Sequence, residues 1–207
     1  MSRMPYRRSA LMQDRLADNR ARIMRATRHL IARGGFRAAR ISAVAAEAGL
    51  ATGSIYRYFA SQAQLFIEVL TAAVAHEIAL LERITAAPEP AAMRLRNAVE
   101  AFARRALDGR NLAYAFIAEP IGAPVEVARL RSRREFSAVF QRLMLAGMRS
   151  GEFPQQDAEV AAACIVGAFT EALVGPIAPG SKAASARARA RLIAAIGHFC
   201  VAAVSAS

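Results

Sequence analysis

Residues 49–59, GLATGSIYRYF, gather in one short stretch several side chains suited to contact a polyanion. Tyr56 and Tyr58 present hydroxyl groups on rigid rings, and Arg57 presents a guanidinium that can form paired hydrogen bonds with a phosphate or a guanine edge. Gly53 and Ser54, just before them, allow a backbone to come close to a phosphate. The residue types therefore indicate nucleic-acid contact.

Helical spacing separates this stretch into two faces. On a helix that begins near Thr52, Ile55 and Phe59 lie four residues apart and face the core together, which leaves Tyr56 and Arg57 on the opposite side. A short amphipathic helix over residues 41–48 precedes it, and Gly49 separates the two. Two short helices around a glycine turn form the helix-turn-helix that fits a DNA major groove. The alternative is that the tyrosines pack sideways in a core.

Charge is concentrated in the same part of the chain. Residues 1–60 carry twelve arginines and three acidic residues, a net charge of +9 out of +12 for all 207 residues. A positive field of this kind favours an anionic partner such as DNA. Lys182 is the only lysine, so nearly every basic residue is an arginine. This preference for arginine either suits phosphate recognition or reflects genome base composition.

The rest of the chain is predicted to be helical throughout. No run of residues alternates with period two, and Ala, Leu, Arg and Glu dominate, so we expect an all-α fold of about nine helices. Glycine and proline clusters divide these helices. The expected helices are residues 18–33, 41–48, a short one from 52, 62–85, 94–107, 111–118, 125–149, 157–175 and 183–206.

Two stretches, IMRATRHLIARGGF and ISAVAAEAGLATGSIYRYFASQAQLFIEVL, resemble the DNA-binding domain of the TetR family of bacterial transcriptional repressors. The family pattern has Ile and Ala on the first helix, a Gly-aromatic pair at its end, an IA..AG motif, G-[ST]-[IL]-Y-x-[YH]-F, and a Ser before a long helix. The matching positions are Ile23, Ala26, Gly35, Phe36, Val44, Ala45, Ala48, Gly49, Gly53, Ser54, Ile55, Tyr56, Tyr58, Phe59, Ser61, Leu65 and Phe66.

The resemblance implies a two-domain plan, a homodimer, and a pocket for a small-molecule effector in the C-terminal part. We accordingly expect a basic arm over residues 1–17, a three-helix helix-turn-helix domain over 18–66, and a larger helical ligand-binding and dimerisation domain over 67–207. The implied function is that of a repressor released from a near-palindromic, double-stranded operator by a mostly apolar ligand. The predicted DNA contacts are Arg40, Ser42, Thr52, Gly53, Ser54, Tyr56, Arg57 and Tyr58.

Three departures from the family pattern affect DNA contact. The usual Thr or Ser before the second helix is replaced by Ala39-Arg40, where Arg40 keeps a phosphate contact but cannot cap the helix. The usual Ser before the recognition helix is Ala51, which leaves Thr52 as the expected cap. The frequent Lys after Ser61 is Gln62. The arm, with Arg3, Arg7 and Arg8 around Tyr6, either enters a minor groove or is a solubilising tail.

Large apolar side chains between residues 94 and 156 are candidates to enclose the ligand, or else fill an ordinary core. Glu171, inside an apolar stretch, either binds a polar group of the ligand or pairs with an arginine. The predicted ligand-binding residues are Phe102, Tyr114, Phe116, Phe136, Phe140, Met144 and Glu171.

The last two predicted helices are apolar on nearly every face, so a second copy of the chain is expected to cover them. The predicted dimer interface consists of Val160, Cys164, Gly167, Ala168, Ile193, Ile196 and Phe199. We interpret Cys164 as a buried, inert thiol rather than a redox sensor.

An enzyme is not expected. His29, His76 and His198 fall in separate segments, with no metal-ligand spacing, phosphate loop or nucleophile elbow, so neither a metal nor a cofactor is predicted. The apolar run 192–204 is too short for a bilayer, which needs about 20 residues, so we predict a soluble, cytoplasmic protein without a membrane partner. The alternative function is a sequence-tolerant architectural DNA- or RNA-binding protein without a ligand.

Overall fold

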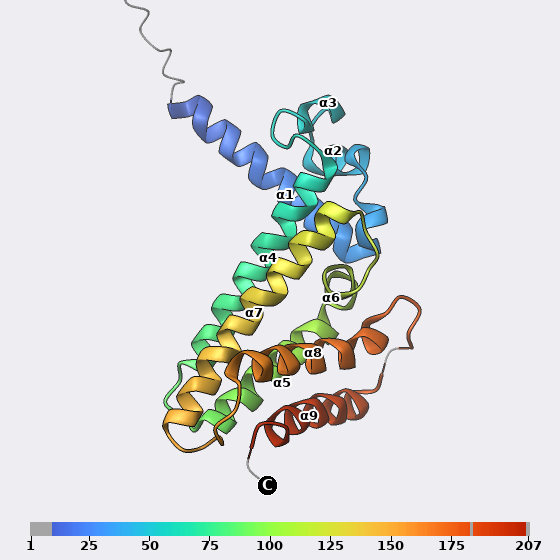
Figure 1. Cartoon of the computed structure of the whole chain (residues 1–207). Helices are drawn as coiled ribbons and strands as arrows, with labels where there is room; N and C mark the ends of the chain where they lie inside the picture. Colours follow the sequence, from blue (N-terminus) through green and yellow to red (C-terminus); the bar gives the residue numbers. More distant parts are fainter. Residues whose placement is uncertain (1–9, 183, 206–207) are drawn as a thin grey trace, which may run out of the picture.

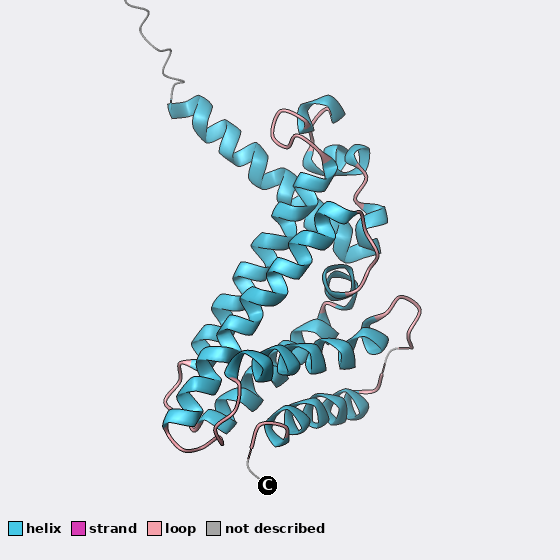
Figure 2. Cartoon of the chain, in the orientation of Figure 1, coloured by secondary structure: helices cyan, strands magenta, loops and turns pink. Residues whose placement is uncertain are grey.

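The computed structural model describes residues 10–182 and 184–205, and these residues form helices and loops without strands (Figure 2). The all-α prediction is confirmed, and the described part of the chain contains nine helices. Their bounds are α1 Ala10–Ala38, α2 Ile41–Ala48, α3 Thr52–Ile55, α4 Gln62–Thr85, α5 Ala91–Asp108, α6 Arg110–Ile117, α7 Ala123–Arg149, α8 Ala158–Ile177 and α9 Ala186–Ala202.

Helices α1 to α3 and the start of α4 form a small head. Ile23, Val44, Ile55, Phe59 and Leu65 are buried in its core, as the apolar spacing of these segments predicts. The core therefore fixes the orientation of α2 and α3 on α1.

Helix α1 differs from the prediction at its start. It begins at Ala10 rather than near residue 18, and Figure 1 shows its first turns projecting beyond the rest of the head. Residues 12–15 are exposed, so this part of the helix has no apolar stripe from which it could be predicted. At the other end, Gly34 and Gly35 interrupt the helix as expected. Arg3, Tyr6, Arg7 and Arg8 of the predicted arm lie outside the described residues.

The body is built on two long helices, α4 and α7, which lie side by side (Figure 1). Helix α4 begins where Ser61 caps it, because the Ser61 hydroxyl accepts a hydrogen bond from the Gln64 amide at 3.1 Å. Since α4 starts in the head and ends at the far end of the body, it connects the two parts mechanically.

Helices α8 and α9 lie at the end of the body away from the head (Figure 1). Both α4 and α8 are long and apolar enough, by length and composition, to cross a membrane. Helix α4 packs against α1, α5 and α7, and α8 packs against α5, α6, α7 and α9. Helices that form the core of a globular protein meet the same criterion, so we assign both to the folded body.

Candidate nucleic-acid interface and cavity

The turn between α2 and α3 depends on Gly49. Its φ of 66° is in the left-handed region, where glycine ends α2 without strain. A Cβ atom at this position would also lie 2.9 Å from a terminal nitrogen of the Arg22 side chain, which donates a hydrogen bond to the Ala48 carbonyl. Gly49 thus allows the turn after α2, and Arg22 of α1 holds the end of that helix.

Helix α3 and the turn that follows it present two opposite faces, as the spacing predicts, although the helix ends at Ile55, and Phe59 lies beyond it. Ile55 and Phe59 are buried, whereas 55% of Tyr56 is exposed and Arg57 is exposed beside it. The prediction that Thr52 caps this helix is wrong. Ala51 occupies the cap position without a side-chain bond, and Thr52 is already the first helical residue, so its side chain is exposed.

The remaining predicted DNA contacts differ in exposure. Arg40 and Ser42, at the start of α2, are exposed, and so is Gly53, where a Cβ atom would meet nothing within 4 Å. Ser54 is half-buried. We define the recognition surface as the exposed members of the predicted set: Arg40, Ser42, Thr52, Gly53, Tyr56 and Arg57.

Tyr58 has a supporting contact. It is half-buried, and its hydroxyl accepts a hydrogen bond of 3.0 Å from the Asn19 amide of α1. This contact positions the residues after α3, so Tyr58 is less available to DNA than Tyr56.

Sequence reasoning missed the role of Arg20. Its guanidinium lies over the Phe59 ring, 4.9 Å from the ring centre, and forms an ion pair with Glu68 of α4. Arg20 stands three residues before the buried Ile23, so its place on the inner face of α1 was the available signal. The arginines of α1 therefore include residues that hold the head together.

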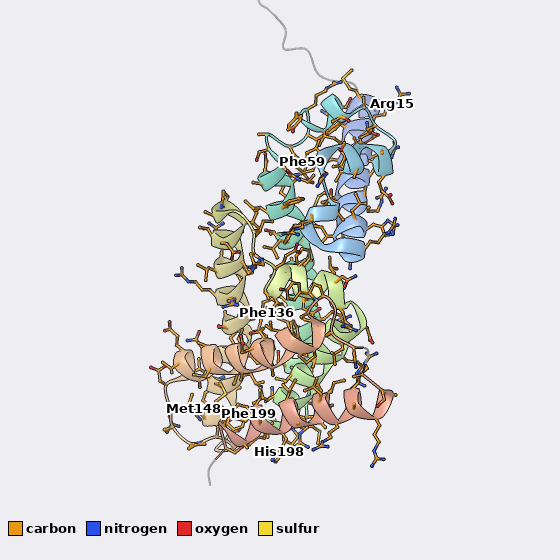
Figure 3. The ribbon with its side chains drawn as sticks, turned by 90° about the vertical axis from the view of Figure 1, so that its right-hand side faces the viewer. Arg15, Phe59, Phe136, Met148, His198 and Phe199 are labelled. Carbon is orange, nitrogen blue, oxygen red and sulfur yellow. The ribbon has the colours of Figure 1, made fainter. Side chains whose placement is uncertain are left out.

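All three histidines, His29, His76 and His198, have exposed side chains. The His29 Nδ1 atom lies 2.6 Å from the Glu47 carboxylate and so joins α1 to α2. His198 is exposed on α9, as Figure 3 shows near the end of the body. Among the described residues, no three His, Cys, Asp or Glu side chains lie close enough to hold a metal ion.

A cavity of about 560 Å³, partly open to solvent, lies between α1, α4, α5, α6, α7 and α8. This volume lies within the range of sites for small molecules. Phe102, Phe116 and Phe136 of the predicted ligand-binding set line it, and Figure 3 places Phe136 in the middle of the body.

The other predicted ligand residues lie elsewhere. Phe140 and Met144 are fully buried in the core of the body and do not line the cavity, because they follow Phe136 on α7 one and two turns further from the head. Tyr114 packs against that core, and Glu171 is exposed on α8. Phe169, which does line the cavity, was missed because the sequence analysis assigned its helix to the dimer interface.

The sequence matches two family descriptions. "Bacterial regulatory proteins, tetR family" matches residues 23–69, which span most of α1, α2, α3 and the start of α4. "Tetracyclin repressor-like, C-terminal domain" matches residues 88–173 in the body. The chain belongs to the TetR family of bacterial transcriptional regulators. It is therefore a DNA-binding regulator of transcription with the two-domain fold of this family.

Solved structures share the fold of this TetR-family chain. The transcriptional regulator FadR from Bacillus subtilis, in complex with stearoyl-CoA, is 19% identical with a TM-score of 0.76, over 89% of this chain and 98% of that one. RolR in complex with resorcinol is 20% identical with a TM-score of 0.68, over 94% and 91%. A TetR-family regulator from Agrobacterium tumefaciens is 16% identical with a TM-score of 0.72, over 92% and 100%. No curated protein sequence matches the chain.

In this TetR-family protein, α6 joins the cavity to the head. Asn111, near the start of α6, donates a hydrogen bond of 3.0 Å to the Ala32 carbonyl of α1. Just after α6, the Glu119 carboxylate accepts one of 3.1 Å from the Phe36 amide. Residues of α6 also line the cavity, so one helix contacts both the cavity and the end of α1.

Part of α8 and α9 is exposed and apolar. We define the outer face as Val160, Cys164 and Gly167 of α8 with Phe199 of α9, all of which are exposed. A Cβ atom at Gly167 would meet nothing within 4 Å. Figure 3 shows Phe199 on α9, at the end of the body opposite Phe59 of the head.

Two residues of the predicted interface need correction. Ile193 and Ile196 are buried in the core of the chain itself, so they present almost no surface to a partner, and Ala168 is half-buried. Cys164 is exposed on α8 in the single chain, so its interpretation as a buried thiol depends on a partner that covers the predicted interface. The buried cysteine is Cys200, whose pKa is raised to about 11 by removal from water.

Proposed function

We propose that this regulator is a homodimeric repressor that leaves a near-palindromic operator when a small, mostly apolar ligand binds in its cavity. Residues 18–66 bind DNA, and residues 67–207 bind the ligand and dimerise. The protein acts in the bacterial cytoplasm, where its double-stranded operator lies, and it catalyses no reaction.

The recognition surface supports operator binding. Tyr56 and Arg57 are exposed in the turn that ends α3, and the buried side chains of Ile55 and Phe59 anchor the other side of this segment. A rigid display of a hydroxyl and a guanidinium suits base edges and phosphates in a major groove. The net charge of residues 1–60 adds a sequence-independent attraction to the DNA backbone.

The cavity carries the ligand part of this proposal. It is lined by Phe102, Phe116, Phe136 and Phe169, and it also borders α4 through Val69 to Glu77. A ligand that separates these walls would move α4, whose first residues belong to the head. FadR in complex with stearoyl-CoA and RolR in complex with resorcinol show that similar folds hold a small molecule.

The outer face supports a homodimer. Phe199 is 60% exposed and Val160 is 57% exposed, a costly arrangement for a chain that stays alone in water. Small residues at Gly167 and Cys164 let a second α8 approach closely, and the two-fold axis of such a dimer would give an operator with two half-sites.

The test begins with the DNA fragments that the purified protein retains, sequenced to find the operator. Compounds that stabilise the protein in a thermal-shift screen are then added to the operator complex. An inducing ligand should weaken operator binding by the same factor by which operator weakens ligand binding. If every stabilising compound leaves operator affinity unchanged, the induction model fails, while operator recognition stands.

The alternative, an architectural protein without a ligand, predicts similar affinity for all duplexes. A salt titration that compares the operator with random duplex separates the two, because only specific binding leaves a large affinity ratio at each salt concentration.

A further inference from the structure

The side of α7 that lines the cavity changes from polar to aromatic along its length. Arg129, Ser132, Arg133 and Phe136 follow one another at helical spacing and all line the cavity. The polar residues come first, nearer the α6–α7 loop and the head, and Phe136 comes last. One wall of the cavity is therefore amphipathic.

The aromatic end is continuous with the core of the body. Phe102 packs edge-on against Phe136, with ring centres 5.8 Å apart, and against Phe169 at 4.8 Å. All three rings line the cavity, and Val166 joins them from α8. This end suits a hydrocarbon chain.

The polar end contains a buried guanidinium with one donor left over. Arg129 is only 8% exposed, and its two terminal nitrogens donate to both Glu126 carboxylate oxygens, at 2.9 and 3.0 Å, and to the carbonyls of Ala115 and Glu119, at 3.1 and 2.7 Å. Its Nε–H is buried without a hydrogen-bond partner in the described part of the chain. Buried donors are normally paired, so an unpaired one in a cavity wall points to an acceptor that arrives with a ligand.

The charges around the cavity have one predominant sign. Five arginines line it against a single glutamate, Glu77, which is already paired with Arg105. The other arginines are Arg25, Arg28, Arg129 and Arg133. Since the carboxylate of Glu126 balances Arg129, the surplus positive charge comes from Arg25, Arg28 and Arg133.

We infer that the ligand of this cavity is an amphipathic anion, with a carboxylate or phosphate at Arg129 and Arg133 and an apolar chain among Phe102, Phe136 and Phe169. This inference rests on the proposed role of the cavity as the effector site. It excludes neutral and cationic molecules of the same shape as good ligands, because they leave the guanidinium end without an acceptor.

Isothermal titration calorimetry on the full chain without DNA tests this inference with four probes of equal chain length: decanoate, decanoyl-CoA, decanol and decylammonium. Decanoate or decanoyl-CoA should bind at least about tenfold more tightly than decanol, and decylammonium should bind least. Binding of decanoate alone would identify a free carboxylate as the head group, and binding of decanoyl-CoA alone would identify a phosphate-bearing one. Failure of both anions to bind more tightly than decanol overturns the inference.

Three substitutions on α7 locate the head group. Arg129→Met should weaken binding of the anion about tenfold and leave decanol affinity unchanged, whereas Arg131→Met, an exposed residue outside the cavity lining, should change neither. Arg129 also donates hydrogen bonds to two backbone carbonyls, so the Arg129→Met variant could fail to fold. In that case Arg133→Met, a change at an exposed residue, is the test, and it should also weaken binding of the anion and leave decanol affinity unchanged. The inference is contradicted if anion affinity is unchanged in Arg133→Met and also in Arg129→Met, where that variant folds.

Operator release, measured with the same probes, separates the two proposals. Arginine-dependent binding of an anion that leaves operator affinity unchanged supports the ligand class and contradicts the effector role. Operator release by decanol at the same concentration as by decanoate supports the effector role and overturns the ligand class.

Discussion

The Glu119 carboxylate of the α6–α7 loop accepts a hydrogen bond from the backbone amide of Phe36, at 3.1 Å, just after the glycine break in α1. Gly35 has a φ of 69°, and a Cβ atom there would lie 2.5 Å from a Glu119 carboxylate oxygen. The carbonyl of Glu119 in turn accepts a bond from Arg129 in the cavity wall. Hydrogen bonds therefore connect the cavity to the head through one residue.

Replacing Glu119 should weaken this connection. We expect Glu119→Ala to lower the free energy of unfolding by about 1–3 kcal/mol, because the Phe36 amide loses a charged acceptor. Effectors should still bind this variant but release operator less effectively. Chemical denaturation and operator titration measure the two effects, and Glu135→Ala, an exposed change on α7, serves as the control. Full effector response in Glu119→Ala would show that the signal takes another path.

Arg57 should contribute directly to operator affinity. We expect Arg57→Ala to weaken operator binding by about 1–3 kcal/mol if it contacts a base, and to weaken binding to all duplexes about equally if it contacts phosphate. Arg83→Ala removes the same charge from an exposed position near the end of α4, far along the chain from the head, and should have little effect. Fluorescence anisotropy with operator and random duplex measures the difference. Equal losses in the two variants would mean that only net charge matters.

The outer face should fail to dimerise when a charge is placed in it. We expect Gly167→Glu to be a folded monomer with poor operator affinity, since the position is open within the chain but lies in the proposed interface. Ala79→Glu, exposed on α4, is the matched control and should remain dimeric. Sedimentation at micromolar concentration distinguishes these states. A monodisperse monomer for the unsubstituted chain would count against the dimer.

The two thiols should differ in reactivity. Burial raises the pKa of Cys200 to about 11, so at about pH 8 this residue stays a protonated, inaccessible thiol and should resist alkylation. Cys164 is exposed in the single chain and should be alkylated in the Gly167→Glu monomer but protected in the dimer. Mass spectrometry after timed labelling measures both sites. Rapid labelling of Cys164 in a wild-type dimer would place the interface elsewhere.

Much of the fold could be predicted where local chemistry marks the ends of helices. Helix α2 ends at Ala48 because Gly49 takes the left-handed conformation, and α4 begins at Gln62 because Ser61 caps it, and both bounds were predicted. The family motif predicted the position of α3. Its cap could not be predicted in the same way, because a sequence does not distinguish a Thr at the cap from a Thr at the first helical residue.

Positions that depend on packing between distant helices could not be predicted. Helices that are apolar on nearly every face, such as α8 and α9, give no periodic signal for which face is outward, so Ile193 and Ile196, which lie in the core of the chain, were assigned to the dimer interface. Similarly, Phe136 and Phe140 are both large and apolar, and only the arrangement of α5, α7 and α8 puts the first at the cavity and the second in the core. The amphipathic cavity follows from that arrangement.

Operator binding by the Tyr56→Ala, Arg57→Ala double variant tests the role of the recognition surface most directly. Circular dichroism should show an unchanged fold, because both side chains are exposed. We expect the double variant to lose its preference for operator over random duplex. Operator affinity and preference equal to those of the unsubstituted protein, with the fold intact, would contradict it.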